Sequence, residues 1–381
     1  MTQIITIIDS VSTFIFITHT AWREAPRIRH QLARLLTGQG HQVIFFERAN
    51  YPWIPQTEKL SKPEKGITVV KCRNLIHHQL RISPPLDWMN AKTVRADLAR
   101  WIEYLGLDPH AAVFNFAHDY WFLRKLFPES DRIITVIHDD WEAQARLPIF
   151  GHVSRNMRLT CEMSDEVFAV STPLVRRLEE WCSPKLLPPW SVRQYREPHK
   201  DVALRNTLLF WGFIGSGLDT ALIEEISRSL SRSRPDWKIL MVGPSQSDIQ
   251  RARITQSLKD FENITFLPEH DLDALPLDRV IVALIPYGEM KFHSACEIPN
   301  KTFHFLSRGI PILASGMPNL IEKPFIHKME DARSFELGLE NCIQNFNVWQ
   351  PIIKDFVREN SGDTRLELLG ITRELSIDDH W

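Results

Sequence analysis

The 381-residue sequence is poor in cysteine, glycine and long apolar runs. Its five cysteines lie far apart and form no C-x-x-C pair: Cys72, Cys161, Cys182, Cys296 and Cys342. An odd, scattered set favours free thiols in a reducing compartment over a disulfide framework or a zinc site. Glycine (15) and proline (24) are together too few for a collagen-like or low-complexity protein. No run approaches the roughly 18–20 apolar residues of a membrane span, and the first residues lack a basic start and a cleavage motif, so we expect no spanning or secretory segment.

The net charge of −2 is unevenly distributed. Residues 1–200 carry 26 Lys and Arg against 21 Asp and Glu, a net of +5, and the remainder has a net of −7. Neither part is basic enough for a nucleic-acid-binding protein. The basic first part is either a solvated surface of mixed sign or a surface for anionic lipid headgroups or a phosphorylated acceptor, and Trp53 and Trp88 look exposed. We therefore expect a cytoplasmic protein, with peripheral attachment to the inner face of the membrane as an open alternative.

Short apolar runs alternate with helical stretches along the first half of the chain. The runs predict strands at 14–18, 41–47, 67–71, 111–116, 132–138 and 166–171, and the helical spacing predicts helices at 26–36, 90–104 and 148–163. Strands rich in Val, Ile and Phe between helices are typical of a parallel sheet covered on both faces.

A proline-rich stretch at 182–200 interrupts this rhythm, which then restarts. The second half predicts strands at 207–213, 238–244, 263–268, 279–287 and 310–315, and helices at 219–230, 247–261, 300–309 and from Asp331 onward. Asp219 suits the N-cap of its helix and Gly309 a left-handed C-cap. The sequence thus predicts an α/β protein with two doubly wound, Rossmann-like parallel-sheet domains, at 1–195 and 200–361.

Ligands of doubly wound sheets bind beyond the carboxyl ends of the strands. The loop GFIGSGLD (212–219) follows a predicted strand and precedes a helix, so its backbone N–H groups suit a phosphate, although a tight turn explains the glycines equally well. Lys301 stands in the first turn of the helix after Pro299, where its charge opposes the helix dipole unless an anion is bound. Lys301 is therefore a candidate phosphate ligand, and an ordinary exposed lysine is the alternative.

The segment P-N-K-T-F-H-F-L-S-R-G-I-P (299–311) resembles the donor-binding segment of GT-B glycosyltransferases, which use nucleotide sugars. FWGFIGSGLDTALIEEIS followed by WKILMVGP is similar to the opening of their donor domain, and HTAWREAPRIRHQLARLL and SDEVFAVSTPLVRRL are more loosely similar to acceptor-domain segments. The resemblance implies two domains facing across a cleft, with a C-terminal helix at about 362–381 packing back on the first domain. It implies a donor site formed by Gly215, Ser216, Gly217, Tyr287, Asn300, Lys301 and His304.

Two departures from the family pattern bear on the mechanism. The family glutamate that binds the ribose falls at His304, and Cys296 replaces the first residue of the Glu-x7-Glu pair of the large retaining subfamily. A neutral imidazole can still bind one hydroxyl. The xanthan-type glucuronosyltransferase, which inverts configuration, also lacks the helix glutamate, so the chain is placed nearer to it.

An inverting transfer needs a general base for the acceptor hydroxyl. The strand-end segment VIHDDWEA offers His138, Asp139 and Asp140, with Asp140 as the aligned choice and a like-charged neighbour to raise its pKa. Capping of the next helix explains the same aspartates equally well. Further acceptor or phosphate ligands are His19, Arg23 and Arg27, with polar decoration of a surface helix as the alternative.

Several other motifs are weaker evidence for a functional site. Asp271-x-Asp273 is expected to be a solvated turn whose leucines are buried, and His77-His78 lacks partner carboxylates. NFAHDYW (115–121) follows a strand, and its aromatic residues suit a sugar ring or the core.

The predicted function is metal-independent transfer of a sugar from a nucleotide diphosphate sugar to a hydroxyl of a glycan or lipid-linked acceptor, in cell-surface polysaccharide biosynthesis. No cofactor is expected, and the donor is a co-substrate. The alternatives are a nucleotide-sugar 2-epimerase and a non-catalytic glycan or nucleotide-sugar binding subunit.

Overall fold

The computed structural model describes residues 11–24, 26–48, 59–76, 83–144, 152–245 and 248–371. The chain divides into two compact units: unit 1 comprises Met1–Pro188 and Gly362–Trp381, and unit 2 comprises Pro189–Ser361. The division falls inside the proline-rich stretch. Trp53 and the pair His77-His78 lie outside the described residues.

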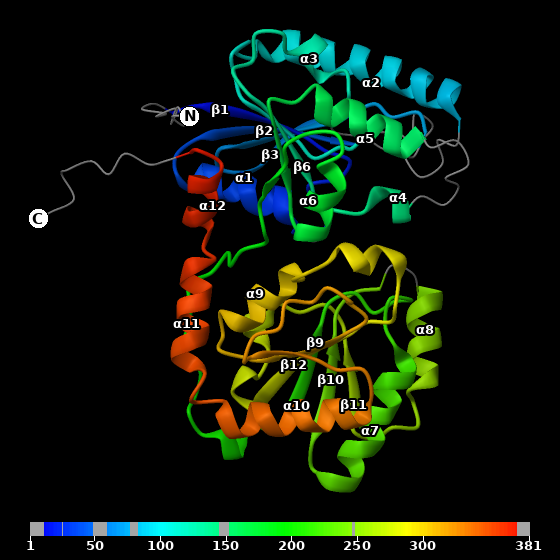
Figure 1. Ribbon diagram of the computed structural model, residues 1–381, viewed down its shortest axis with the longest axis vertical. Coiled ribbons are helices and arrows are strands. Elements are labelled where there is room, and N and C mark those ends of the chain that lie inside the picture. The colour runs from blue at the N-terminus through cyan, green and yellow to red at the C-terminus, as the bar shows by residue number, and fades with distance from the viewer. Residues whose placement is uncertain are drawn as a thin grey trace, which may run out of the picture. The chain divides into compact units, whose positions relative to one another are not determined.

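Unit 1 contains an eight-stranded sheet with the order β3-β4-β2-β1-β5-β6-β7-β8 (Figure 1). The strands are β1 (Thr13–Ile17), β2 (Gln42–Arg48), β3 (Leu60–Glu64), β4 (Ile67–Cys72), β5 (Val113–Asn115), β6 (Ile133–Ile137), β7 (Glu166–Ala169) and β8 (Lys185–Leu186). All neighbouring strands are parallel except β3 and β4. The central strand β1 lies between β2 and β5, so the sheet grows in opposite directions from that point.

Helices cover both faces of this sheet. They are α1 (Ile28–Gly38), α2 (Pro84–Leu105), α3 (Leu123–Leu126), α4 (Trp141–Gln144), α5 (His152–Glu162), α6 (Thr172–Leu178) and α12 (Gly362–Leu368). Figure 1 shows α2 and α1 on opposite sides of the strands. Alternation along β1 explains the two layers: Ile15 and Ile17 join a buried cluster with Val94 of α2, while Phe14 packs 5.9 Å from the Phe114 ring in a separate aromatic group.

Unit 2 contains a six-stranded, fully parallel sheet with the order β11-β10-β9-β12-β13-β14. The strands are β9 (Thr207–Trp211), β10 (Lys238–Val242), β11 (Ile264–Leu267), β12 (Val280–Pro286), β13 (Ile312–Ser315) and β14 (Ile326–Lys328). The helices are α7 (Thr220–Ser233), α8 (Asp248–Ser257), α9 (Asn300–Leu306), α10 (Ala332–Asn345) and α11 (Gln350–Glu359). Counted from β9, the order is 3-2-1-4-5-6, the arrangement of doubly wound nucleotide-binding sheets.

Most sequence-predicted elements are confirmed, and the differences have local causes. Asp219 caps α7 by accepting a hydrogen bond from Leu222 N at 2.9 Å, and Gly309 has a φ of +67°. The strands β3, β8 and β14 were not predicted, because two or three residues, or the polar run LSKPE, carry no apolar alternation. Helix α2 begins six residues earlier than expected, with two prolines in its first turn. Among the described residues, no helix is long and apolar enough to cross a membrane.

Candidate functional site

The switch point of the unit 2 sheet lies between β9 and β12, where the strand order reverses. Beyond these strands, the loop 212–219 is tied to the end of β12: Asp219 N donates to Pro286 O at 2.9 Å, and Gly288 N donates to Gly217 O at 3.0 Å. Leu218 also forms an isolated bridge with Tyr287. The glycine-rich loop and Tyr287 therefore border the same crevice position that binds ligands in doubly wound sheets.

Lys301 reaches this switch point from the first turn of α9. Its ammonium lies 4.7 Å from the centre of the Phe210 ring on β9 and 4.9 Å from the centre of the Tyr287 ring beyond β12. Within the described ranges, Lys301 forms neither an ion pair nor a side-chain hydrogen bond. Ring faces attract a cation but leave its hydrogen-bond donors unused. The Lys301 ammonium therefore has a positive charge and hydrogen-bond donors that are available to a bound anion.

Two glycines allow the backbone to approach this ammonium. Gly212 has a φ of +153°, and a Cβ there would overlap Lys301 Nζ. Gly243, at the end of β10, has a φ of +149°, and a Cβ there would overlap the carbonyl oxygen of Gly212. A side chain at Gly243 would require backbone movement, whereas one at Gly212 would displace the Lys301 side chain, and both positions have a φ that side chains rarely adopt. Gly243 was not among the predicted site residues, although a glycine directly after an apolar strand is a signal for close backbone approach.

The glycines expected to bind the donor are less constrained than Gly212. A Cβ at Gly215 would meet only Gln250 Oε1, at 3.4 Å, and nothing lies within 4 Å of a Cβ at Gly217. Ser216 between them is exposed. Their assignment to the donor site stays a prediction that rests on the backbone of the loop and not on a need for glycine.

Asn300 and His304 lie on the same helix as Lys301. Asn300 Oδ1 is buried and has no hydrogen-bond partner among the described residues. The His304 ring lies 5.3 Å from the Trp211 ring, and burial, followed by the charges of Arg193 and Arg308, lowers the pKa of His304 to about 4. His304 is therefore a neutral imidazole near pH 7, able to accept or donate one hydrogen bond to a hydroxyl.

The motif Asp271-x-Asp273 forms the expected exposed turn. Asp271 caps a short 3₁₀ helix (Leu272–Ala274) by accepting from Asp273 N at 3.0 Å, and Leu272 is buried. Asp273 forms ion pairs with Arg193 and with Arg308 Nη2, the latter at 2.6 Å. These carboxylates are neutralised by arginines, which argues against a metal ligand at this motif.

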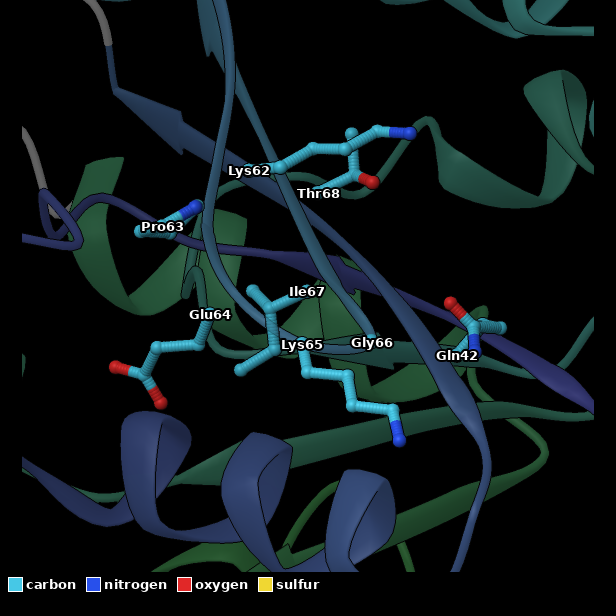
Figure 2. Close-up of a pocket in the computed structure, with 8 residues that line it drawn as sticks. All are labelled: Gln42, Lys62, Pro63, Glu64, Lys65, Gly66, Ile67 and Thr68. Carbon is cyan, nitrogen blue, oxygen red and sulfur yellow. The ribbon is translucent and has the colours of Figure 1, made fainter.

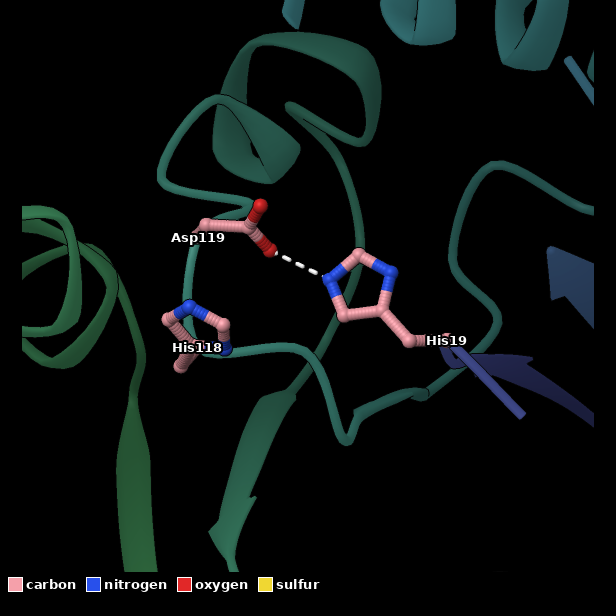
Figure 3. A group of neighbouring side chains, drawn as sticks. All are labelled: His19, His118 and Asp119. Carbon is pink, nitrogen blue, oxygen red and sulfur yellow. Dashed lines mark hydrogen bonds and ion pairs between the residues drawn. The ribbon is translucent and has the colours of Figure 1, made fainter. Parts of the chain in front are cut away.

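The switch point of the unit 1 sheet lies between β1 and β5 and holds a buried histidine–aspartate pair. His19 follows β1, Asp119 follows β5, and His19 Nε2 lies 2.5 Å from Asp119 Oδ1 (Figure 3). Both side chains are almost fully buried. The Tyr120 ring meets the His19 ring edge-on at 4.9 Å. A carboxylate that holds an imidazole in this way fixes its tautomer and stabilises its protonated form, as in catalytic dyads.

His118 lies beside the pair, so the three side chains are also the group that could hold a metal ion among the described residues (Figure 3). Their ligand atoms all lie within 4.8 Å of one another. The separation of His19 Nε2 and Asp119 Oδ1, 2.5 Å, is that of a hydrogen bond, whereas two ligands of a tetrahedral zinc ion lie about 3.3 Å apart. The geometry favours a dyad over a metal centre.

His138, the first of the expected base candidates, has both ring nitrogens in contact with polar groups. Arg29 Nη1 lies 2.7 Å from His138 Nε2, and His138 Nδ1 lies 3.4 Å from Val136 O. Burial, followed by the charge of Arg29, holds the pKa of His138 well below its ordinary value. A neutral imidazole that accepts from a guanidinium is a poor proton acceptor.

The two neighbouring aspartates differ from each other. Asp140 accepts a hydrogen bond from Ala143 N at 2.9 Å and forms an ion pair with Arg177 at 2.7 Å, so it has the geometry of a helix cap. Asp139 has a raised pKa, and the main cause is burial, with the like charge of Asp140 the smallest contribution. The like charge of the neighbouring aspartate is therefore a minor cause of the raised pKa of Asp139.

The arginines expected near the end of β1 lie at the surface. Arg23 and Arg27 are exposed, and Arg27 lies 3.9 Å from Glu24. Arg29, which the sequence analysis passed over, is only 2% exposed, and burial, followed by the charge of Arg27, lowers its pKa to about 9. A single sequence gives no signal for this burial, because an arginine on a helix usually faces water.

A separate cavity of about 350 Å³ lies at the β3–β4 edge of unit 1 (Figure 2). Figure 2 shows its lining residues: Gln42, Lys62, Pro63, Glu64, Lys65, Gly66, Ile67 and Thr68. Gln42 and Ile67 begin β2 and β4, so this cavity lies at the amino ends of the parallel strands. Ligands of such sheets bind at the opposite edge, and Glu64 is already paired with Arg34 at 2.7 Å.

The two parallel sheets define the class of fold: each unit is Rossmann-like, and together they correspond to the GT-B fold, which confirms the predicted fold class. No protein-family model matches the sequence, and no curated protein matches it. Solved structures do match. Sucrose-phosphate synthase from Thermosynechococcus elongatus has a TM-score of 0.69 at 14% identity and covers 94% of this chain and 97% of its own.

Two further structures match over the same length. HepE from Anabaena, solved with UDP-glucose, has a TM-score of 0.62 at 10% identity, covering 94% of this chain and 98% of its own. WaaG, a glycosyltransferase involved in lipopolysaccharide biosynthesis, has a TM-score of 0.59 at 14% identity with the same coverage. Identities this low establish a shared fold, so the function rests on the residues of the two switch points.

Proposed function

We propose that this protein is a glycosyltransferase that moves a sugar from a nucleotide diphosphate sugar to a hydroxyl group of a glycan or lipid-linked acceptor. Lys301 carries the proposal. It is an ammonium without an ion-pair partner in the described ranges, placed at the switch point of a 3-2-1-4-5-6 sheet and against the backbone of Gly212, where a side chain would overlap it. A departing diphosphate needs such a charge, because negative charge develops on it in the transition state.

The donor contacts follow from the same helix. Asn300 Oδ1 is a buried acceptor without a partner among the described residues, and His304 is neutral near pH 7, so both suit donor hydroxyl groups. The backbone of residues 215–217 and the Tyr287 side chain border the sugar in this proposal. HepE was solved with UDP-glucose, which makes a UDP-sugar the first donor class to test.

We place the general base in unit 1. The acceptor oxygen attacks the anomeric carbon while the bond from that carbon to the diphosphate oxygen breaks. In unit 1, His19, which Asp119 holds at 2.5 Å, is the candidate acceptor of the hydroxyl proton. In unit 2, Lys301 is the candidate group for balancing the charge of the departing diphosphate. This single displacement inverts the configuration and requires no metal. We do not assign the general base to Asp140, because its carboxylate caps α4. Asp139 is the second candidate base.

The proposal includes a cellular role and a location. A role in cell-surface polysaccharide biosynthesis and a cytoplasmic location, at the inner face of the membrane when the acceptor is lipid-linked, fit an enzyme that uses nucleotide sugars. WaaG, which shares the fold, is involved in lipopolysaccharide biosynthesis.

Thermal denaturation with UDP, GDP, TDP and CMP tests the donor assignment. A ligand that binds only the native state at about 100 times its Kd stabilises it by about 2.7 kcal/mol, so one nucleoside diphosphate should raise the melting temperature by several degrees. The matching nucleotide sugar is then incubated with and without acceptor extracts. Transfer that needs acceptor supports the proposal. Conversion of the donor alone would indicate a 2-epimerase, and binding without any reaction would indicate a binding subunit.

A further inference from the structure

Helix α2 of unit 1 has one face in the core and one face without partners in the described part of the chain. Its buried residues recur at helical spacing: Asp87, Asn90, Ala91, Val94, Asp97 and Leu98. The opposite face begins with Trp88 and Met89, which are 59% and 50% exposed, and continues with Lys92, Arg95 and Arg100. At 3.6 residues per turn these five positions fall within an arc of roughly 140° on one side of the helix, here called the α2 face.

The apolar start of the α2 face is unusual for a surface. Trp88 is the exposed tryptophan of the described ranges, and it stands directly beside the exposed Met89. The Lys92 ammonium lies 5.5 Å from the centre of the Trp88 ring. A tryptophan next to a lysine is the pairing found at membrane–water interfaces, where the ring enters the headgroup region and the ammonium stays at the lipid phosphates.

The charge of the α2 face is unbalanced. Lys92, Arg95 and Arg100 form no ion pair with any described residue, and Glu103 is the acidic residue exposed on this side. The adjoining helix α5, tied to α2 by a hydrogen bond of 2.5 Å from Asn156 to Asp87, adds the exposed Arg155. Because the three basic residues of this face outnumber the single acidic residue Glu103, the face is complementary to an anionic surface.

We propose that the α2 face docks on an anionic lipid bilayer, with Trp88 and Met89 inserted at the headgroup boundary and Lys92, Arg95 and Arg100 against lipid phosphates. A bilayer fits better than a protein partner, because two apolar side chains are too few for the apolar centre of a stable protein interface, whereas shallow insertion combined with basic residues suffices for reversible lipid binding. Docking would bring the protein to the membrane that holds a lipid-linked acceptor. The proposed lipid binding does not require that the protein transfers sugars.

Sedimentation of the full chain with vesicles tests the docking. Vesicles contain phosphatidylcholine alone or with 30% phosphatidylglycerol, at low and high salt. Wild-type protein should bind the anionic vesicles, and salt should release it. Each basic residue near such a surface contributes roughly fivefold to partitioning, so K92E/R95E should weaken binding by at least about 25-fold. Trp88→Ser should weaken it by about tenfold, since it removes a large apolar side chain that enters the bilayer on docking.

Matched controls come from α8 and the turn that follows it in unit 2, where Ile249 is 68% exposed. Ile249→Ser and the charge reversal R253E/K259E should leave vesicle binding unchanged, because they alter exposed residues of the same kinds elsewhere. The proposal is overturned if wild-type protein ignores anionic vesicles, if it binds neutral vesicles as well as anionic ones, or if the α2 variants bind like wild type.

UDP binding separates this proposal from the proposed function. The α2 variants should keep the thermal stabilisation by nucleotide that wild-type protein shows, which also verifies that they are folded. Vesicle binding without nucleotide binding would support docking and contradict the proposed sugar transfer. Nucleotide binding without vesicle binding would contradict docking and leave the proposed sugar transfer unaffected.

Discussion

The two units share a topology and differ in what they place at the point where their strand order reverses. In unit 2 the position is occupied by backbone and by one ammonium: Gly212 and Gly243 leave no side chain in the way, and Lys301 lies between two aromatic rings. In unit 1 it is occupied by buried side chains that hold one another, with His19 on Asp119 at 2.5 Å. An open, positive site suits a diphosphate, and a buried hydrogen-bonded imidazole suits proton transfer. The sheet fixes where a site lies, and the residues beyond the strands decide what it does.

The exposed fractions of the charged side chains also differ between the two units. Arg29 and Asp119 in unit 1 are 2% and 3% exposed, whereas Lys301 in unit 2 is half-buried. Charged groups in the interior need partners, which explains why Arg29 is hydrogen-bonded to His138. A ligand phosphate supplies the missing partner for Lys301.

The largest expected effect is on catalysis in unit 1. His19→Ala should lower the transfer rate by about 10²–10⁴-fold, because a positioned general base contributes that much. Asp119→Asn should also lower the transfer rate, since the amide cannot stabilise the protonated imidazole of His19. Steady-state kinetics measure both. A loss confined to Asp139→Asn, with His19→Ala active, would move the base to the other candidate.

Glycine substitutions in unit 2 come next. Gly243→Ala should lower the free energy of unfolding by roughly 2–4 kcal/mol, because a Cβ at positive φ is strained and would overlap Gly212 O. Gly217→Ala is the matched control, with nothing within 4 Å of its Cβ, and it should be neutral. Urea denaturation compares the two. Equal effects would show that close backbone approach does not shape this crevice.

A pH dependence is expected in both units. Burial lowers the pKa of His30 in unit 1 and of His304 in unit 2 to about 4 in each case. Between about pH 6.5 and 4 the unfolded chain binds more protons than the folded chain, so stability should fall as pH falls through this window, by on the order of 1–3 kcal/mol for each histidine.

Denaturation at pH 7 and pH 4.5 measures this slope. His304→Gln and His30→Gln should each make it shallower, and His270→Gln, at an exposed position of unit 2, should leave it unchanged. If all three variants keep the wild-type slope, other groups govern the acid sensitivity.

The smallest effect concerns Asp140. Asp140→Ala should cost about 1 kcal/mol of stability through the lost cap, while the transfer rate stays within about threefold of wild type. Asp140→Asn keeps an acceptor for Ala143 N and should recover most of the stability. A 100-fold slower transfer in Asp140→Asn would instead restore Asp140 as the base.

The sequence predicted most strands and most helices because apolar runs and helical spacing are local signals, whereas the short or polar strands β3, β8 and β14 carry no such signal. Lys301 was identified for the same reason: its place in the first turn of a helix after Pro299 is readable from neighbouring residues. Asp119 as the partner of His19 was not identified, because the contact joins residues 100 positions apart through the pairing of β1 with β5. Gly243 likewise depends on the register of β9 and β10, and the burial of Arg29 depends on the packing of α1.

Calorimetric titration of UDP into the wild-type protein and three variants tests the central claim that unit 2 holds the diphosphate and unit 1 the base. Relative to wild type, Lys301→Met should bind UDP about 10–100-fold more weakly, the loss expected for a hydrogen bond to a charged group, while His19→Ala should bind it unchanged. Lys354→Met, an exposed lysine of the same unit, is the control. Wild-type affinity in Lys301→Met, or lost affinity in His19→Ala, would contradict the account.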